Sequence, residues 1–124
     1  MPRTWKLRLS PDDTKPPLSL NDRSHWRKKA ATTKRVRQWV FQSAWYQVPA
    51  CSAVAVELHY VPRDARRRDR DNLVATLKPC IDGLVDAGVV PDDTPEYVDW
   101  SVHIDPPNRA DPHLYLLIRE SHTP

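Results

Sequence analysis

Glycine is scarce in this chain of 124 residues, which has 2 glycines against 13 prolines. A glycine-rich loop of the kind that cradles nucleotide phosphates is therefore excluded, and turns must be set mainly by proline. Only two cysteines occur, Cys51 and Cys80, and they have neither the spacing of a disulfide framework nor that of a Cys/His metal site. Cysteine use of this kind predicts a reducing compartment.

Long apolar runs are also missing. No segment approaches the roughly 20 apolar residues that a membrane-spanning helix needs, and the first residues lack the apolar run of a signal peptide. We therefore expect no membrane association and a cytoplasmic protein, either bacterial or phage-encoded within its host. The length predicts a single domain, 1–124, with a real hydrophobic core and a frayed tail from about residue 121.

Catalytic histidine patterns are absent as well. No Ser/His/Asp triad can be identified, and His25, His103, His113 and His122 follow no motif spacing. His59 alternates away from the apolar side of its predicted strand. We interpret all five histidines as structural or solvated.

Charge is present in quantity and is unevenly placed. Residues 1–70 carry 16 of the 19 Lys and Arg and 6 of the 16 Asp and Glu, a formal charge of +10, while residues 71–124 carry −7. Such asymmetry predicts a polyanionic partner such as nucleic acid. The alternative is a basic surface without a partner.

Hydrophobic periodicity predicts a fold of the α/β (α+β) class, with a small mixed sheet of about four strands packed against two main helices in the order β-α-β-α-β-β. The strands are expected over 5–9, 51–60, 97–104 and 113–118, and the helices over about 32–47, capped by Thr32 or Thr33, and 72–87. Pro79 predicts a kink in the second helix or an irregular first turn. Strand 97–104 should pair beside 51–60, which would let the Asp92–Asp93 turn fold back toward the second helix's N-terminus.

The central stretch is Arg66-Arg67-Arg68-Asp69-Arg70-Asp71-Asn72. In an extended segment alternate side chains point to the same side, so Asp69 and Asp71 converge while Arg68 and Arg70 face away. Converging carboxylates suit a hard cation such as Mg²⁺, and guanidinium forks suit phosphate oxygens. Together they provide what phosphodiester hydrolysis needs. The alternative is a surface loop in which these charges neutralise one another.

A second basic segment covers residues 15–31. It opens with Pro16-Pro17, which favours extended backbone, and it contains cations around one aromatic ring, Trp26. That ring either stacks on a nucleic-acid base or caps the core. We interpret the segment as a DNA-binding loop with contacts from Asn21, Arg23, Arg27, Lys28 and Lys29.

Several motifs in this order resemble the RusA family of Holliday-junction resolvases. They are the basic run with Asp69-Arg70-Asp71-Asn72, then Lys78, Asp82-Gly83-Leu84, Ala87-Gly88 and Asp92-Asp93, and a Pro16-Pro17-Leu18-Ser19-Leu20-Asn21 segment like the family's N-terminal Pro-Pro-x-x-Asn loop. The matches span about Pro16 to Ile104. One departure concerns the lysine, which lies four residues after the second aspartate in the best-known members but seven after Asp71 here.

The resemblance implies a small homodimer and a Mg²⁺-dependent endonuclease acting on branched DNA such as the four-way junction. By position, Asp69, Asp71 and Asp93 would be catalytic and hold the metal, Lys78 would take the place of the family's functional lysine, and Asn72 and Asp92 would support them. On this hypothesis the DNA backbone is held by the N-terminal loop and by Arg66, Arg67, Arg68 and Arg70.

A two-fold dimer would supply two identical sites for paired nicks, and the apolar faces of the second helix and the last strands are candidate interfaces. Two other functions stay open. One is a branched-DNA-binding protein with impaired catalysis, which the shifted position of the lysine favours. The other is a metal-dependent phosphoesterase acting on simpler nucleic-acid substrates.

Overall fold

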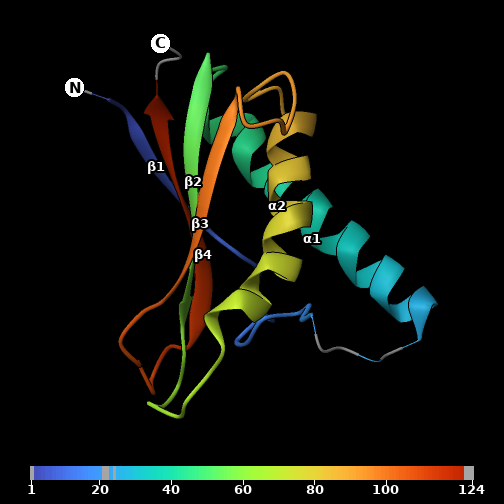
Figure 1. The fold of residues 1–124 in the computed structure, drawn as a ribbon, viewed down its shortest axis with the longest axis vertical. Coiled ribbons are helices and arrows are strands. Elements are labelled where there is room, and N and C mark those ends of the chain that lie inside the picture. Colours follow the sequence, from blue (N-terminus) through green and yellow to red (C-terminus); the bar gives the residue numbers. More distant parts are fainter. Residues whose placement is uncertain (1, 21–22, 24, 122–124) are drawn as a thin grey trace.

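The computed structural model describes residues 2–20, 23 and 25–121. It has two layers, a four-stranded mixed sheet and a pair of helices on one of its faces (Figure 1). The elements are β1 (Thr4–Arg8), α1 (Trp26–Gln47), β2 (Ala53–Val61), the 3₁₀ turn η1 (Arg70–Leu73), α2 (Val74–Asp86), β3 (Val98–Ile104) and β4 (His113–Ser121). The predicted α+β class, with the order β-α-β-α-β-β, is confirmed.

The strand order in the sheet is β1-β4-β2-β3. β4 pairs antiparallel with both β1 and β2, whereas β3 runs parallel to β2, with Val54 opposite Val98 and Tyr60 opposite Ile104. β2, α2 and β3 therefore form a parallel crossover unit with the helix as its connection. The expected pairing of residues 97–104 beside 51–60 is confirmed.

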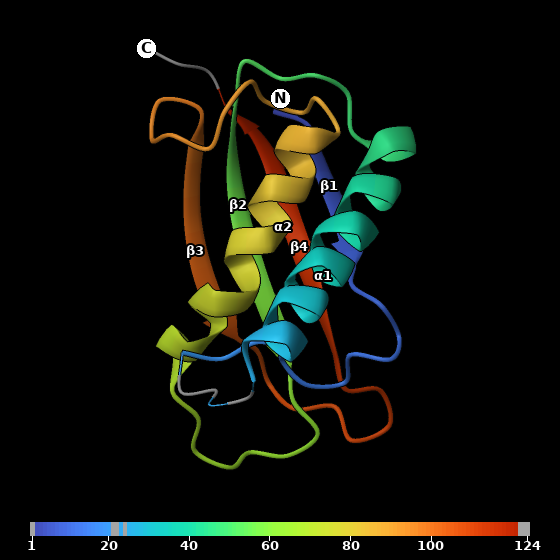
Figure 2. The ribbon, with the colours of Figure 1, turned by 90° about the vertical axis from the view of Figure 1, so that its right-hand side faces the viewer.

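One face of the sheet carries the core. Period-two alternation turns Val54, Val56 and Leu58 toward the helices, where each is at most 1% exposed. α1 contributes Val36 and Val40 at four-residue spacing to the same core cluster. Figure 2 views this helical layer, with α1 and α2 lying across the sheet. No helix of the described residues covers the opposite face of the sheet (Figure 1).

α1 begins at Trp26, six residues before the predicted start, so the prediction of a Thr32 or Thr33 cap is wrong. His25 is the N-cap, and its Nδ1 accepts a hydrogen bond from the Arg27 N–H at 3.2 Å. The Thr33 hydroxyl instead donates to the Lys29 carbonyl at 2.8 Å, inside the helix. The predicted DNA-binding loop of 15–31 is thus helical from Trp26 onward.

α2 is preceded by the irregular first turn that Pro79 predicts, with the regular helix starting at Val74 and Pro79 inside it. Gly88 follows the helix in the left-handed region, with φ of 77°, and the Gly88 and Val89 N–H groups donate to Val85 and Leu84 carbonyls. Gly83 faces α1 where the two helices approach closely.

The leucines and the isoleucine of η1 and α2 are buried in the core. Leu73 of η1 and Leu77, Ile81 and Leu84 of α2 are at most 4% exposed. The expectation that this helix face forms a dimer interface is therefore wrong, because the sheet and α1 already cover it. Across the described residues, no helix has both the length and the apolar character needed to cross a membrane.

Candidate nucleic-acid interface

Two adjoining hollows lie where β2 ends, with volumes of about 420 and 440 Å³. They share Lys15, Tyr60 and Arg68 in their walls. We call them together the basic groove, defined by its cations and by two polar residues of the central stretch: Lys15, Arg63, Arg66, Arg67, Arg68, Asp69 and Asn72. A groove lined by guanidinium and ammonium groups suits a phosphate backbone.

Arg68 holds the groove's loop in shape. Its guanidinium donates to the Asp64 carboxylate at 2.8 Å and to the Asp64 and Arg66 carbonyls at 2.8 and 3.0 Å, and it lies 5.7 Å from the centre of the Tyr60 ring. The hydrogen bond from Arg68 also lowers the pKa of Asp64. Because three of its hydrogen bonds go to this loop, Arg68 contributes to the site mainly by fixing the shape of the loop.

The other arginines of the stretch are open to solvent. The Arg66 side chain is 69% exposed and lies 3.7 Å from the Asp64 carboxylate. Arg67 and Arg70 are exposed, and neither has an ion pair with any residue that the structure describes. These three side chains are therefore available to a polyanion.

The backbone turns at Asp69, so the prediction of an extended segment through Asp71 is wrong. Asp69 is extended, with φ −87° and ψ 114°, but Arg70 and Asp71 belong to η1. The Asp69 Oδ1 accepts a hydrogen bond from the Asp71 N–H at 3.0 Å and caps that turn. Both carboxylates are exposed, and Asp69 keeps Oδ2 for a ligand.

Asp93 lies at the other end of the sheet from Asp69. It precedes β3, which starts beside Val54, whereas Asp69 follows the end of β2 near Tyr60. Six residue steps at about 3.3 Å separate those ends by roughly 20 Å, and Figure 1 shows the loop before β3 and the turn η1 at opposite ends of the molecule. The expected folding back of the Asp92–Asp93 turn toward the N-terminus of α2 does not occur, because a parallel crossover returns the chain to the start of its neighbour strand.

One chain therefore does not gather the three predicted metal carboxylates. Among the described residues, a single group of at least three His, Cys, Asp or Glu side chains has ligand atoms all within 4.8 Å of one another, and it does not contain Asp69, Asp71 or Asp93. Asp92 uses its carboxylate locally, accepting a hydrogen bond from the Asp93 N–H at 2.8 Å.

Lys78 is exposed on α2. Helical backbone runs from η1 into α2 without a break, since Leu73 and Val74 both have right-handed helical angles. Three 3₁₀ steps of about 2.0 Å and four α steps of about 1.5 Å give roughly 12 Å of rise from Asp71 to Lys78. The irregular turn lengthens this separation instead of shortening it, and a lysine stem spans only about 6 Å.

The proline-rich segment is anchored beside the groove. The buried Thr76 hydroxyl donates to the Leu18 carbonyl at 2.8 Å and accepts from the Leu18 N–H at 3.3 Å. This double contact with α2 holds Lys15, Pro16 and Ser19 in the groove wall. Part of the segment predicted to bind DNA thus lines the basic groove.

The remaining predicted DNA contacts lie at the start of α1. Arg27 and Lys28 are exposed in its first turn, Lys29 is half-buried, and Arg23 is exposed before it. Asn21 lies outside the described residues. Trp26 does not cap the core, because it is 67% exposed, with the Arg27 guanidinium 5.2 Å from its ring centre. An exposed ring among cations suits a stacked base.

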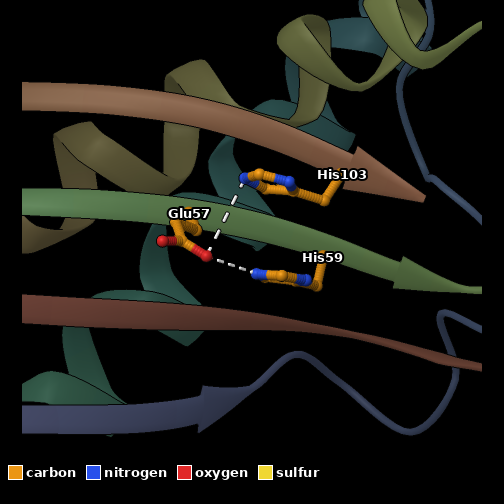
Figure 3. Close-up of side chains that lie close together, drawn as sticks. All are labelled: Glu57, His59 and His103. Carbon is orange, nitrogen blue, oxygen red and sulfur yellow. Dashed lines mark hydrogen bonds and ion pairs between the residues drawn. The ribbon is translucent and has the colours of Figure 1, made fainter. Parts of the chain in front are cut away.

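The sequence interpretation missed a cluster on the bare face of the sheet. Glu57, His59 and His103 form the group whose ligand atoms lie within 4.8 Å of one another (Figure 3). A signal was available, because Glu57 and His59 share one face of a strand at period two and His103 alternates onto the same face of the neighbouring strand.

No protein-family model matches this chain, and a search of curated proteins finds no significant relative. The resemblance to the RusA family therefore rests on sequence motifs alone, from the proline-rich segment to Asp92-Asp93.

Proposed function

We propose that this protein is a Mg²⁺-dependent endodeoxyribonuclease that resolves four-way DNA junctions by paired symmetric nicks in DNA recombination and repair. The observation that carries the proposal is the basic groove, whose wall contains Asp69 and Asn72 among five cations. The resemblance to RusA resolvases supports the same assignment. Two free cysteines, one of them buried, accord with our proposal of a cytoplasmic location.

The donor chemistry at the groove fits Mg²⁺. Asp69 and Asp71 offer exposed carboxylate oxygens, the hard ligands that this cation prefers. When bound, the metal would activate water for attack on the phosphodiester and stabilise the leaving oxygen. Arg66 and Arg67 hold the strand by its phosphates, and Asn72 offers an amide beside it.

The third carboxylate is supplied by a second subunit in this proposal. β3 is an edge strand, and its end, Ile104, lines the groove together with Asp69. If two copies of β3 pair antiparallel about a two-fold axis near Ser101, the residues preceding one β3 lie beside Ile104 of the other. Asp93 of the partner subunit would then approach Asp69 and Asp71. Because Lys78 lies further along α2, it neutralises phosphate charge in this proposal only where the bound DNA extends along that helix to its ammonium group.

The test is cleavage of a labelled four-way junction by wild-type protein, Asp71→Asn, Asp93→Asn and a refolded mixture of the two variants. Each variant alone should lose at least about 100-fold in rate. The mixture should recover nicking, because a heterodimer contains one site with Asp71 from one chain and Asp93 from the other. Asp12→Asn, which removes an exposed carboxylate of an N-terminal turn, is the matched control.

Two outcomes contradict the proposal. If Asp71→Asn cuts at the wild-type rate, the proposed nuclease site is refuted. A mixture that stays inactive while wild-type protein cuts shows that Asp93 does not act across subunits.

A branched-DNA-binding protein with impaired catalysis is the second candidate, favoured by the separation of Asp93 from Asp69 within one chain. It predicts salt-dependent junction binding without Mg²⁺-dependent nicks. A phosphoesterase on simpler substrates predicts a monomer that cuts linear duplex as readily as junctions. A linear duplex control and sedimentation analysis separate these possibilities.

A further inference from the structure

We propose that Glu57, His59 and His103 form a Zn²⁺ site on the bare face of the sheet, separate from the basic groove and independent of the proposed nuclease function. The three side chains come from neighbouring strands, Glu57 and His59 from β2 and His103 from β3. His59 and His103 are direct register partners. Figure 3 shows all three gathered on one side of the sheet.

The ligand atoms already lie close together. The Glu57 Oε1 is 2.7 Å from the His59 Nε2 and 3.8 Å from the His103 Nε2, and all three atoms lie within 4.8 Å of one another. In a tetrahedral zinc site with metal–ligand bonds near 2.1 Å, ligand atoms are about 3.4 Å apart. Each contact with Glu57 therefore needs to change by less than about 1 Å.

His59 is oriented as a metal-binding histidine is oriented. Its Nδ1 lies 2.7 Å from the Asp105 Oδ1, and the other oxygen of Asp105 accepts a hydrogen bond from the Tyr115 hydroxyl at 2.8 Å. The Tyr115 hydroxyl thereby holds the Asp105 carboxylate in place behind His59. A carboxylate behind Nδ1 fixes the tautomer that leaves Nε2 for a metal.

Glu57 supplies the anionic ligand of the group. Carboxylate oxygens lie 2.7 Å from both ring nitrogens of His59, that of Asp105 at Nδ1 and that of Glu57 at Nε2. A divalent cation between the Glu57 Oε1 and the His59 Nε2 would be bound by a lone pair from each atom.

His103 is the ligand that adjusts. Its ring is stacked on His59 at 4.5 Å with an interplanar angle of 12°, so the in-plane lone pairs of the two rings do not yet point at one centre. His59 is confined, since Tyr115 stacks on its other side at 4.7 Å. The His103 side chain is 38% exposed, and its Nε2 contacts the Ser101 hydroxyl. It can tilt toward Glu57 by giving up that contact.

Two imidazoles and one carboxylate favour Zn²⁺ over Mg²⁺, because nitrogen donors suit borderline transition metals. The fourth position would face solvent, since none of the helices that the structure describes covers this face. A metal held by both strands would join the edge strand β3 to β2. Binding should therefore stabilise the fold in proportion to the logarithm of the zinc concentration.

The test is calorimetric titration of chelator-treated protein with Zn²⁺, together with thermal unfolding and Co²⁺ absorption, in wild type, His103→Gln and Glu57→Gln. We expect one Zn²⁺ per chain in wild type, a rise in Tm, the visible absorption of tetrahedral Co²⁺, and at least tenfold weaker binding in both variants. His113→Gln removes another half-buried imidazole of the sheet and should bind like wild type. Asp71→Asn should also bind like wild type, which separates this site from the proposed nuclease centre.

Three results would overturn the site. The first is wild-type protein that binds Zn²⁺ no more tightly than the Glu57→Gln/His103→Gln double variant. The second is a loss of affinity in His113→Gln as large as that in His103→Gln. The third is Co²⁺ binding without tetrahedral absorption, which would mean that the three ligands do not converge on one ion.

Discussion

Replacing Thr76 by valine tests how the proline-rich loop is fixed beside the basic groove. Thr76 is fully buried, and its hydroxyl makes both a 2.8 Å and a 3.3 Å hydrogen bond with the backbone of Leu18. Valine keeps the shape but leaves the Leu18 N–H and C=O facing a methyl group. A buried polar group left without a partner costs about 1–3 kcal/mol. Since the longer bond is the weaker one, we expect a total loss of about 2 kcal/mol.

That loss corresponds to a fall in Tm of roughly 8 °C, using an unfolding entropy of about 2.1 cal/mol/K per residue over the chain. The loop would also leave the groove wall, taking the Lys15 ammonium with it. The slope of junction affinity against salt should then decrease by about one phosphate contact. Urea and thermal unfolding measure the first effect, and binding at several salt concentrations measures the second.

Thr76→Ser is the matched control, because it keeps the hydroxyl and removes only a methyl group. It should lose stability by about 1 kcal/mol and keep the wild-type salt slope. The reasoning is refuted if Thr76→Val binds junction DNA with the wild-type slope and unfolds at the wild-type temperature.

Two further predictions concern the contact between α1 and α2. A Cβ at Gly83 would lie 2.6 Å from the Arg37 carbonyl oxygen and 2.9 Å from the Val40 Cβ. Gly83→Ala should therefore lower the free energy of unfolding in urea by about 1–3 kcal/mol. A variant as stable as wild type would show that the helices can move apart without cost. Arg37 donates two hydrogen bonds to Asp86, at 2.6 and 2.8 Å, which lowers the pKa of Asp86. This contribution is present above the carboxyl's ordinary pKa of 3.8 and is lost progressively as the pH falls below that value through the lowered pKa of the folded protein. Asp86→Asn should therefore cost under about 1 kcal/mol at pH 7 and less in acid, and a cost that does not decrease with falling pH would contradict this.

The sequence allows the architecture to be predicted because periodicity is a local signal. Val54, Val56 and Leu58 alternate on one strand face, and all are buried as expected. The error at α1 has a local cause too: Thr33 is a good cap by residue type, but helix formers precede it and its hydroxyl bonds back to Lys29. The residue type alone does not indicate whether a threonine caps the start of a helix or bonds to a carbonyl inside it.

The candidate site is less predictable because it depends on contacts between distant segments. Asp69 and Asp71 are only two positions apart in sequence, yet a single capping hydrogen bond ends the extended backbone between them. The location of Asp93 depends on whether β3 runs parallel or antiparallel to β2, which its alternation does not reveal. The cluster of Glu57 and His59 with His103 depends on exact strand register, and a shift by one residue would turn one of the imidazoles to the helical face.

The place of β4 in the sheet has a consequence for how the protein is made. β4 is the last strand among the described residues, yet it lies between β1 and β2, which do not pair with each other. The chain must therefore be synthesised through β4 before β1 has a neighbouring strand to pair with. Until then two strand edges are unprotected, and a product truncated before His113 could not close the sheet and would be prone to aggregate.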